Sequence, residues 1–358
     1  MTRVKIIGAG SIGNHLAQAA RRMSWDVVVV DVSRDALRRM QHEIYPQRYG
    51  KWDDRISLYE SGTEPKGGFD VICICTPPEI RMTLAVEALA ERPKVLQLEK
   101  PFTSPNNAVL PAFLSALKSY PKTQVVVGYD HAVSESIQFV TEQLFKQLIG
   151  EIITIDVEFR EHWKGIFAAH PWLSGPEDSY LGYWRKGGGA LSEHSHALHL
   201  FRHLCLAAGL GKWTSVQSML DVQREGEAEF DRVALLQFRL GSGATGRVVQ
   251  DVVTLPTKKI ARVTGDRGVI EWQCGGHPTG DVVRIAMSSG EMSERVFPKT
   301  RPDDFFREML YIDRVLEGAL NNTLSLQSGL DVLRVIEQSW AQYTGDASAD
   351  VVGAGEQI

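Results

Sequence analysis

The chain has 358 residues, which is more than one ordinary hydrophobic core accommodates and suits two domains. Its net charge of -5, without a long basic run, argues against nucleic acid and anionic membranes as partners, and no apolar stretch approaches membrane-spanning length. The cysteines are scattered without a CxxC pair, so we expect a reduced, cytoplasmic protein without a disulfide framework.

The first third of the chain alternates short apolar runs with helical patterns. The predicted strands span residues 4–10, 26–32, 55–61, 69–78, 94–101 and 123–130. The predicted helices span residues 11–23, 33–44 with Ser33 as N-cap, a segment that starts near 79, and 106–120. This alternation predicts an α/β domain with a parallel, doubly wound sheet, a Rossmann domain over residues 1–128.

The pattern changes after this domain to longer runs that alternate apolar and polar residues. These runs cover residues 151–163, 232–240, 245–255, 259–272 and 281–289. They predict an α+β domain over residues 129–345, with a large, open, mostly antiparallel sheet that has one wet face. One helix is predicted within residues 187–203, after the three glycines, and two more are predicted over 302–320 and 324–343. The last two could return to pack across the domain boundary. Residues 346–358 are expected to be a frayed tail.

The segment from Gly8 to Gly13 has glycines in GxGxxG spacing between a predicted strand and a predicted helix. Such glycines let the backbone turn tightly and approach a pyrophosphate at the helix N-terminus. Asp31 ends the next strand, where a carboxylate would bind ribose hydroxyls and repel a 2′-phosphate. NAD is therefore favoured over NADP, although the nearby Arg34 weakens that preference. The alternative is a glycine turn that binds nothing and a solvated aspartate.

Two further loops follow predicted strands at the carboxyl edge of the sheet, where ligands bind. The first is "CTPP", with Thr76 and Pro77, and the second is "EKP", with Glu99, Lys100 and Pro101. Lys100 could hold a substrate hydroxyl, Glu99 could orient it, and Pro101 would fix the turn, a cis bond being one option. The alternatives are a plain helix start at "CTPP" and an exposed ion pair at "EKP".

These motifs, in this order, resemble the glucose–fructose oxidoreductase / inositol dehydrogenase / rhizopine catabolism (Gfo/Idh/MocA) family. "GAGSIG", "CTPP", "EKP" and a later helix that begins with three glycines carry the resemblance. It implies a Rossmann domain, an α/β domain with an open sheet, bound NAD(P), and hydride transfer at a carbon of a sugar, cyclitol or sugar nucleotide. It also implies Lys100 and His196 as catalytic residues, and self-association of the open sheet face into a homodimer or homotetramer.

The expected cofactor site gathers residues from four loops of the first domain. Its members are Gly8, Gly10, Ser11, Ile12, Gly13, Asp31, Thr76, Pro77, Glu99 and Lys100.

The segment "GGGALSEHSHALHLFRH", residues 187–203, combines glycines, a glutamate and four histidines. On one helix, His196, His199 and His203 would share a broad face, and Glu193 would lie three residues before His196. Three or four converging ligands are needed for a metal, and no HExxH occurs, so we expect no functional metal. An imidazole can take the proton of an alcohol near neutral pH, which makes His196 the acid/base candidate.

The family pattern places an aspartate where this chain has His199, and the resemblance assigns Glu193 and His199 to substrate contacts. A more anionic substrate is one reason for that departure. His203 is expected to be structural, and His194 carries little functional weight. The strand and long loop before this segment offer more candidate contacts, a set suited to a sugar-binding wall or lid. These are Arg160, His162, His170, Trp172, Tyr180 and Arg185.

The sequence thus predicts an NAD-dependent oxidoreductase for a small carbohydrate-type substrate. Two rival functions remain open on sequence grounds. One is an enzyme of the same fold that uses tightly held NAD for a net non-redox reaction, such as glycoside cleavage through a transient ketone. The other is a dinucleotide-binding regulator without catalysis, which the presence of Lys100 and His196 disfavours.

Overall fold

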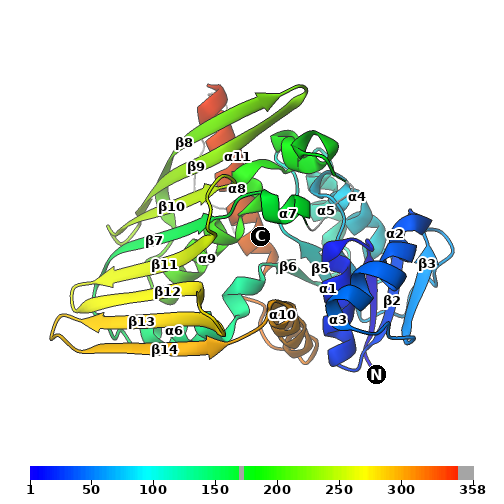
Figure 1. The fold of residues 1–358 in the computed structure, drawn as a ribbon, viewed down its shortest axis with the longest axis horizontal. Coiled ribbons are helices and arrows are strands. Elements are labelled where there is room, and N and C mark those ends of the chain that lie inside the picture. Colours follow the sequence, from blue (N-terminus) through cyan, green and yellow to red (C-terminus); the bar gives the residue numbers. More distant parts are fainter. Residues whose placement is uncertain (169–172, 346–358) are drawn as a thin grey trace. The chain divides into compact units, whose positions relative to one another are not determined.

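The computed structural model describes residues 1–168 and 173–345, which form two compact units (Figure 1). Unit 1 comprises Met1–Thr103, Asn107–Val133 and Thr300–Gly329, and unit 2 comprises Ser104–Asn106, Ser134–Lys299 and the chain from Leu330. A C-terminal segment therefore belongs to the N-terminal unit. The candidate contacts His170 and Trp172, and the predicted tail, lie outside the described residues. None of the helices in the described part of the chain has both the length and the apolar character that a membrane crossing requires.

In the described residues of unit 1, six strands form one parallel sheet in the order β3-β2-β1-β4-β5-β6. The strands are β1 (Arg3–Ile7), β2 (Asp26–Asp31), β3 (Ile56–Glu60), β4 (Val71–Ile74), β5 (Val95–Glu99) and β6 (Gln124–Gly128). All four residues of β4 and all five of β5 are buried, as expected for strands covered on both faces. The predicted doubly wound Rossmann sheet is confirmed.

The helices of unit 1 cover the two faces of this sheet. They are α1 (Ser11–Arg22), α2 (Arg34–Arg39), η1 (Met40–Ile44), α3 (Tyr45–Tyr49), α4 (Pro78–Leu89), α5 (Leu110–Leu117), η2 (Asp130–Val133) and α10 (Arg301–Leu316). The strand order reverses at β1, so right-handed crossovers put α1 and α4 on opposite faces. Helix α10 packs beside α1, and α5 packs beside α4. The predicted N-cap is confirmed, because the Ser33 side chain accepts a hydrogen bond from the N–H of Ala36.

Unit 2 is built on an eight-stranded sheet in its described residues, with the order β14-β13-β12-β11-β7-β10-β9-β8 (Figure 1). The strands are β7 (Ile152–Arg160), β8 (Trp213–Glu225), β9 (Ala228–Leu240), β10 (Thr245–Asp251), β11 (Lys258–Gly265), β12 (Gly268–His277), β13 (Gly280–Met287) and β14 (Met292–Pro298). Only the β7–β10 pair is parallel among these described strands. The predicted open, mostly antiparallel sheet is confirmed.

The helices of unit 2 are mostly short, and six of those described follow one another between β7 and β8. They are α6 (Glu135–Phe145), α7 (Lys164–Ala168), η3 (Pro176–Asp178), η4 (Tyr180–Gly182), η5 (Trp184–Lys186), α8 (Gly189–Glu193) and α9 (His196–Ala207). Helix α11 (Leu326–Thr344) begins in the last segment of unit 1, and its larger part belongs to unit 2.

The eight-stranded sheet has one covered face and one open face. Helix α9 packs on β7 and β10, and α6 packs on β12 and β13. On β7, Ile155, Val157 and Phe159 are fully buried, whereas the alternate positions are polar. Period-two alternation therefore sorts apolar residues to the helix side, as the sequence predicted.

Two features of this sheet differ from the sequence prediction. The run 259–272 was expected as one strand, but it forms the β11–β12 hairpin with a turn at Asp266 and Arg267. Glycines on both sides of this pair supply the turn, which the continuing alternation concealed. The prediction also missed β8 and β14, the two edge strands of the sheet. Most of their residues are exposed or half-buried, so their sequences lack a clear apolar face.

Candidate active site

Three glycines shape the turn between β1 and α1, each for a different reason. Gly8 has a φ of 111°, and a Cβ there would lie 3.0 Å from the carbonyl oxygen of Cys75. A Cβ on Gly13 would lie 1.9 Å from the carbonyl oxygen of Gly8, so only glycine lets the helix approach the turn. A Cβ on Gly10, the N-cap of α1, would meet no described atom within 4 Å. The turn therefore leaves open space beside helix N–H groups, which suits a phosphate.

The first residues of α1 continue this site. Ser11 and Ile12 are partly exposed, as expected for residues beside a ligand space. The Ser11 hydroxyl oxygen accepts a hydrogen bond from Arg48 Nη2 at 2.9 Å. Arg48 is a residue that the sequence analysis did not single out.

Asp31 lies at the carboxyl end of β2, and two backbone groups hold its carboxylate. Oδ2 accepts the N–H of Ala9, and Oδ1 accepts the N–H of Ser33, both at 2.8 Å. Arg34 forms an ion pair with Glu60 at the end of β3. Arg34, whose positive charge weakened the sequence-based preference for NAD, is therefore paired with the Glu60 carboxylate.

A buried arginine joins the "CTPP" and "EKP" loops. Arg81, on α4, is 2% exposed. Its Nη1 donates to the carbonyl oxygens of Glu99 and Pro101, and its Nη2 donates to the carbonyl oxygen of Thr76 at 2.6 Å. The Lys100–Pro101 peptide bond is cis, the option named for that turn. Thr76, Pro77 and the half-buried Lys100 thus lie in two loops that one guanidinium ties together at the carboxyl edge of the sheet.

Below Lys100, two buried glutamates share one amide. Gln97 Nε2 lies 2.9 Å from Glu99 Oε1 and 2.9 Å from Glu308 Oε1. Burial raises the pKa of Glu99, while the charges of Arg81 and Lys100 oppose that rise. Burial and the neighbouring carboxylates raise the pKa of Glu308 well above its usual range. The side chain beside Lys100 is thus part of a buried network.

The sequence analysis missed Arg81, Gln97 and Glu308, although each carried a signal. Gln97 interrupts the apolar run of β5, and Glu308 lies on the apolar stripe of α10. Phe305, Glu308 and Ile312 are spaced three and four apart, and all three are buried. A polar residue at a core position predicts a buried hydrogen-bond partner.

In unit 2, the glycines before α8 lie against other backbone and against one carboxylate. A Cβ on Gly188 would lie 2.2 Å from the carbonyl oxygen of Tyr180, and one on Gly189 would lie 1.9 Å from Asp231 Oδ1. Asp231 is 0% exposed, and its Oδ2 accepts the N–H of Leu191 at 2.7 Å. Burial raises the pKa of Asp231 to about 7. A carboxylate on β9 therefore caps the helix that leads to the histidines.

The prediction of one continuous helix between the three glycines and His203 was wrong. Helix α8 ends at Glu193, and α9 begins at His196. His194 leaves the helical region with φ -94° and ψ 24°, and the Ala197 N–H donates to the His194 carbonyl oxygen at 2.8 Å, a tighter turn. Glu193 and His196 therefore do not lie on one continuous helical face, and the spacing argument that related them fails.

The four histidines have different surroundings. His194 and His199 are 4% and 1% exposed, whereas His196 is partly exposed and stacks on Phe159 with ring centroids 6.5 Å apart. His203 Nε2 lies 2.9 Å from the Thr141 hydroxyl, and burial lowers its pKa to about 4. His203 is thus neutral, partly buried and held by a hydrogen bond, in agreement with a structural role.

Four of the predicted substrate contacts, from β7 and from the loop after it, interact with other residues of unit 2. Arg160 donates from Nη1 to Asp251 Oδ2 at 3.1 Å and from Nε to Glu158 Oε2 at 3.3 Å. His162 Nδ1 accepts the N–H of Lys164 at 3.0 Å. Tyr180 packs against a cluster of buried apolar residues. Its members are Trp163, Leu181, Ala190, Ala228, Phe230 and Val252. Arg185 forms an ion pair with Glu229.

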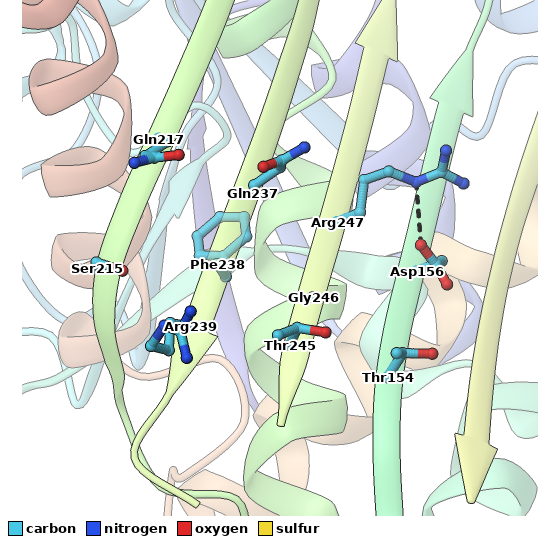
Figure 2. Close-up of a pocket in the computed structure, with 10 residues that line it drawn as sticks. All are labelled: Thr154, Asp156, Ser215, Gln217, Gln237, Phe238, Arg239, Thr245, Gly246 and Arg247. Carbon is cyan, nitrogen blue, oxygen red and sulfur yellow. Dashed lines mark hydrogen bonds and ion pairs between the residues drawn. The ribbon is translucent and has the colours of Figure 1, made fainter. Parts of the chain in front are cut away.

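A pocket lies on the open face of the unit 2 sheet, over β8, β9, β10 and β7 (Figure 2). Figure 2 shows an ion pair at its side, where Arg247 Nε lies 3.0 Å from Asp156 Oδ1. None of the predicted substrate contacts that lie in the described residues lines this pocket. Its lining residues are Thr154, Asp156, Ser215, Gln217, Gln237, Phe238, Arg239, Thr245, Gly246 and Arg247.

Comparison with known proteins identifies two family matches. The model of the oxidoreductase family with an NAD-binding Rossmann fold matches residues 2–129, and that of the GFO/IDH/MocA C-terminal domain matches residues 137–271. No curated protein sequence matches the chain.

Several solved structures share the fold. An oxidoreductase from Agrobacterium radiobacter, in complex with NAD+, L-tartaric acid and magnesium, is 18% identical over 96% of both chains, with a TM-score of 0.74. Levoglucosan dehydrogenase in complex with NADH is 16% identical over 97% of both chains, with a TM-score of 0.73. Aldose-aldose oxidoreductase from Caulobacter crescentus, in complex with glycerol, is 19% identical over 96% of this chain and 98% of its own, with a TM-score of 0.73. At these identities the likeness is one of fold.

Proposed function

This chain belongs to the GFO/IDH/MocA family of oxidoreductases, and we propose that it transfers a hydride between NAD and a carbon atom that bears a hydroxyl group. Bound NAD supplies the hydride acceptor in the oxidising direction. One observation carries the proposal: the glycine turn, Asp31 and the Lys100 loop all follow strands at the carboxyl edge of one parallel sheet. Ligands of doubly wound folds bind at that edge.

Lys100 is the proposed group at the reacting oxygen. Its ammonium binds the substrate oxygen and stabilises the negative charge that develops there. The buried fork of Arg81 supports this role, since a loop fixed at the carbonyl groups of Glu99 and Pro101 holds the base of the lysine in place.

His196 is the proposed acid/base group. Its imidazole takes the proton of the substrate hydroxyl, and in the reducing direction it returns one. Its partial exposure at the start of α9 supports this choice, because His194 and His199 are buried. Glu193, at the end of α8, is proposed to bind substrate.

NAD is proposed in preference to NADP. The fixed carboxylate of Asp31 would accept ribose hydroxyls and repel a 2′-phosphate, and Glu60 neutralises Arg34. Replacing Asp31 with Ser should narrow or reverse the ratio of the two dissociation constants measured by calorimetry, with Asp35→Ser, an exposed neighbour on α2, as the control. Tighter binding of NADP by the unmodified protein would remove the basis of this preference. The other proposed contacts are Gly8, Gly10, Ser11, Ile12, Gly13, Thr76, Pro77, Glu99 and Lys100.

The proposed substrate is a sugar, a cyclitol or a sugar nucleotide. The names of two relatives of the same fold, levoglucosan dehydrogenase and aldose-aldose oxidoreductase, support a carbohydrate. The remaining proposed contacts come from unit 2 and from the loop before the histidines: Arg160, His162, Trp172, Tyr180 and His199.

Residues 1–128 are proposed as the cofactor domain, and residues 129–345 as the domain for substrate binding and self-association. The open face of the unit 2 sheet is the proposed contact in a homodimer or homotetramer, and the exposed Met219 and Leu235 on this face support it. Light scattering of a Met219→Glu, Leu235→Glu variant should report a monomer, and an unchanged mass would exclude this face. The cytoplasmic location stays a prediction.

The proposed activity can be tested with a panel of sugars, cyclitols and sugar nucleotides. Purified protein with NAD should produce NADH absorbance with at least one member of the panel, and calorimetry should report NAD binding. NAD binding without conversion of any compound would favour the regulator. Conversion of a glycoside after a burst of absorbance, without net NADH, would favour the non-redox enzyme.

A further inference from the structure

A chain of three buried polar side chains connects helix α10 with the loop of Lys100. The Gln97 amide donates one hydrogen to Glu99 and the other to Glu308, both at 2.9 Å. Gln97 and Glu308 are 0% exposed, and Glu99 is 4% exposed. Glu99 Oε2 also lies 3.3 Å from the N–H of Lys100. Gln97 and Glu308, which are 211 positions apart in the sequence, are thus hydrogen-bonded to each other next to the proposed catalytic loop.

Strand β6 leaves room for this arrangement. Gly128 pairs with Glu99 in the β5–β6 register. A Cβ on Gly128 would lie 2.8 Å from Glu99 Oε1 and 2.9 Å from Gln97 Nε2. Glycine is therefore required if the two side chains are to lie where they do.

The pKa of Glu99 is raised by burial, but the groups that surround its carboxylate favour the charged form. The Arg81 guanidinium, which is 2% exposed, and the Lys100 ammonium both act to lower the pKa of Glu99 against the effect of burial. Hydrogen bonds from Gln97 and from the Lys100 N–H act in the same direction.

The surroundings of Glu308 favour its neutral form. Burial and the charges of Glu99 on β5 and Asp130 in η2 raise its pKa, and only the hydrogen bond from Gln97 opposes them. Burial raises the pKa of the nearby Cys73 thiol on β4, so this group stays neutral. Glu308 Oε2 has no hydrogen-bond donor among the described residues, and a buried carboxylate oxygen without a donor is costly.

We propose that Glu308 is a positioning residue that keeps a proton and, through Gln97, holds Glu99 as the single negative charge beside Lys100. Two ionised carboxylates on one buried amide would repel each other, so one proton must stay. The neutral acid still offers Gln97 an acceptor, and it leaves the charge on the carboxylate that faces the cations. This proposal rests on the proposed role of Lys100.

Infrared spectroscopy tests the protonation state without cofactor or turnover. Asp231, the other buried acid with a pKa near neutrality, is first replaced by Asn. In this Asp231→Asn background the protein at pH 7.5 should show the carbonyl band of a buried carboxylic acid, and the added Glu308→Gln substitution should remove that band. Glu317→Gln, an exposed position at the end of the same helix, should retain it. A band that survives the added Glu308→Gln substitution, or no such band in the Asp231→Asn background, would overturn the assignment of the proton to Glu308.

Kinetics tests the positioning role with a matched pair of variants. Glu308→Gln keeps an acceptor without a charge, so kcat should stay within about threefold, whereas Glu308→Leu should lower kcat about tenfold or more. In both, the dissociation constant of NAD should change less than about twofold, which separates misplacement of the lysine from loss of fold. Gly128→Ala, which displaces Glu99 without removing a titratable group, should lower kcat as Glu308→Leu does.

Equal losses of kcat in Glu308→Gln and Glu308→Leu would show that the charge of Glu308 is needed and would overturn the proposal. If Lys100→Met left turnover intact, the proposed function of Lys100 would fail, while the infrared result would still report where the proton lies. The two failures are therefore distinguishable.

Discussion

The glycine turn of unit 1 and the glycine-led histidine segment of unit 2 look alike in sequence but are fixed in different ways. Around α1, the constraint on Gly13 comes from a near neighbour, the Gly8 carbonyl that leaves no room for a Cβ, while Gly8 itself also lies against the carbonyl of Cys75 after β4. Around α8, a constraint comes from the Asp231 carboxylate, which accepts the N–H of Leu191 and lies 40 residues later in the chain. A local constraint can be read from spacing, whereas a distant one cannot.

The loop of Lys100 belongs to unit 1, like the glycine turn, and its variant should show the largest effect. Lys100→Met removes the ammonium from the reacting oxygen, so turnover should fall about a hundredfold to a thousandfold, with NAD binding nearly intact. Lys94→Met, at the other end of β5 and exposed, is the control, and it should retain full activity. Steady-state rates and calorimetry measure the two quantities. Turnover of Lys100→Met within a few-fold of normal would move the proposal to a regulator.

His196 tests the region that is fixed from a distance. His196→Asn cannot accept a proton, so kcat should fall about a hundredfold. In the oxidising direction only a neutral imidazole can act, so the rate of the unmodified protein should rise with pH through the neutral range, and the variant should lose that rise.

His203→Asn is the matched control on the same helix. Its neutral ring, which is hydrogen-bonded to Thr141, takes no part in the proposed chemistry, so the pH–rate profile should keep its shape. A rise with pH that persists in His196→Asn but disappears in His199→Asn would identify a different histidine as the base.

Two alanine variants distinguish the glycine that borders the proposed cofactor space from the glycine that packs against backbone. Gly10→Ala adds a Cβ that meets no described atom within 4 Å, so the melting temperature should hold while NAD binding weakens about tenfold or more. Gly13→Ala places a Cβ 1.9 Å from the carbonyl oxygen of Gly8, so stability should fall by about 1–3 kcal/mol. Thermal unfolding and calorimetry measure both. Unchanged NAD affinity in a folded Gly10→Ala variant would contradict a pyrophosphate at this turn.

Asp231 gives the smallest expected effect, a dependence of stability on pH. Burial raises its pKa to about 7, compared with about 3.9 in an unfolded chain. The folded protein therefore holds this proton more tightly, and the contribution of Asp231 to the free energy of unfolding is largest at low pH. It declines as the pH rises from about 4 through 7.

Asp231→Asn cannot ionise and can still accept the N–H of Leu191, so it lacks this decline. Between pH 5 and pH 8 its melting temperature should gain about 3 °C or more relative to the unmodified protein. Asp221→Asn, half exposed on β8, should track the unmodified protein across the same range. If the melting temperatures of all three proteins changed equally between pH 5 and pH 8, Asp231 would not titrate in this range.

The sequence could predict the parts of the site that local geometry decides. The positions of Gly8, Gly13 and Asp31 follow from a strand, a tight turn and a helix. The break before His196 could not be predicted, because residues 190–203 contain neither glycine nor proline to mark it. Glu308 belongs to the same class, since its partner lies 211 residues away, although a charged residue on an apolar stripe did signal a buried role.

The central claim, hydride transfer at a carbon that bears a hydroxyl group, is tested most directly by a mass balance. The protein is incubated with NAD and the substrate found in the panel, and both products are quantified by mass spectrometry, with Lys100→Met as the blank. Hydride transfer from such a carbon should yield one NADH for each molecule of product, and a product lighter than the substrate by two hydrogen atoms. A product formed without NADH, or NADH formed equally by the Lys100→Met blank, would contradict it.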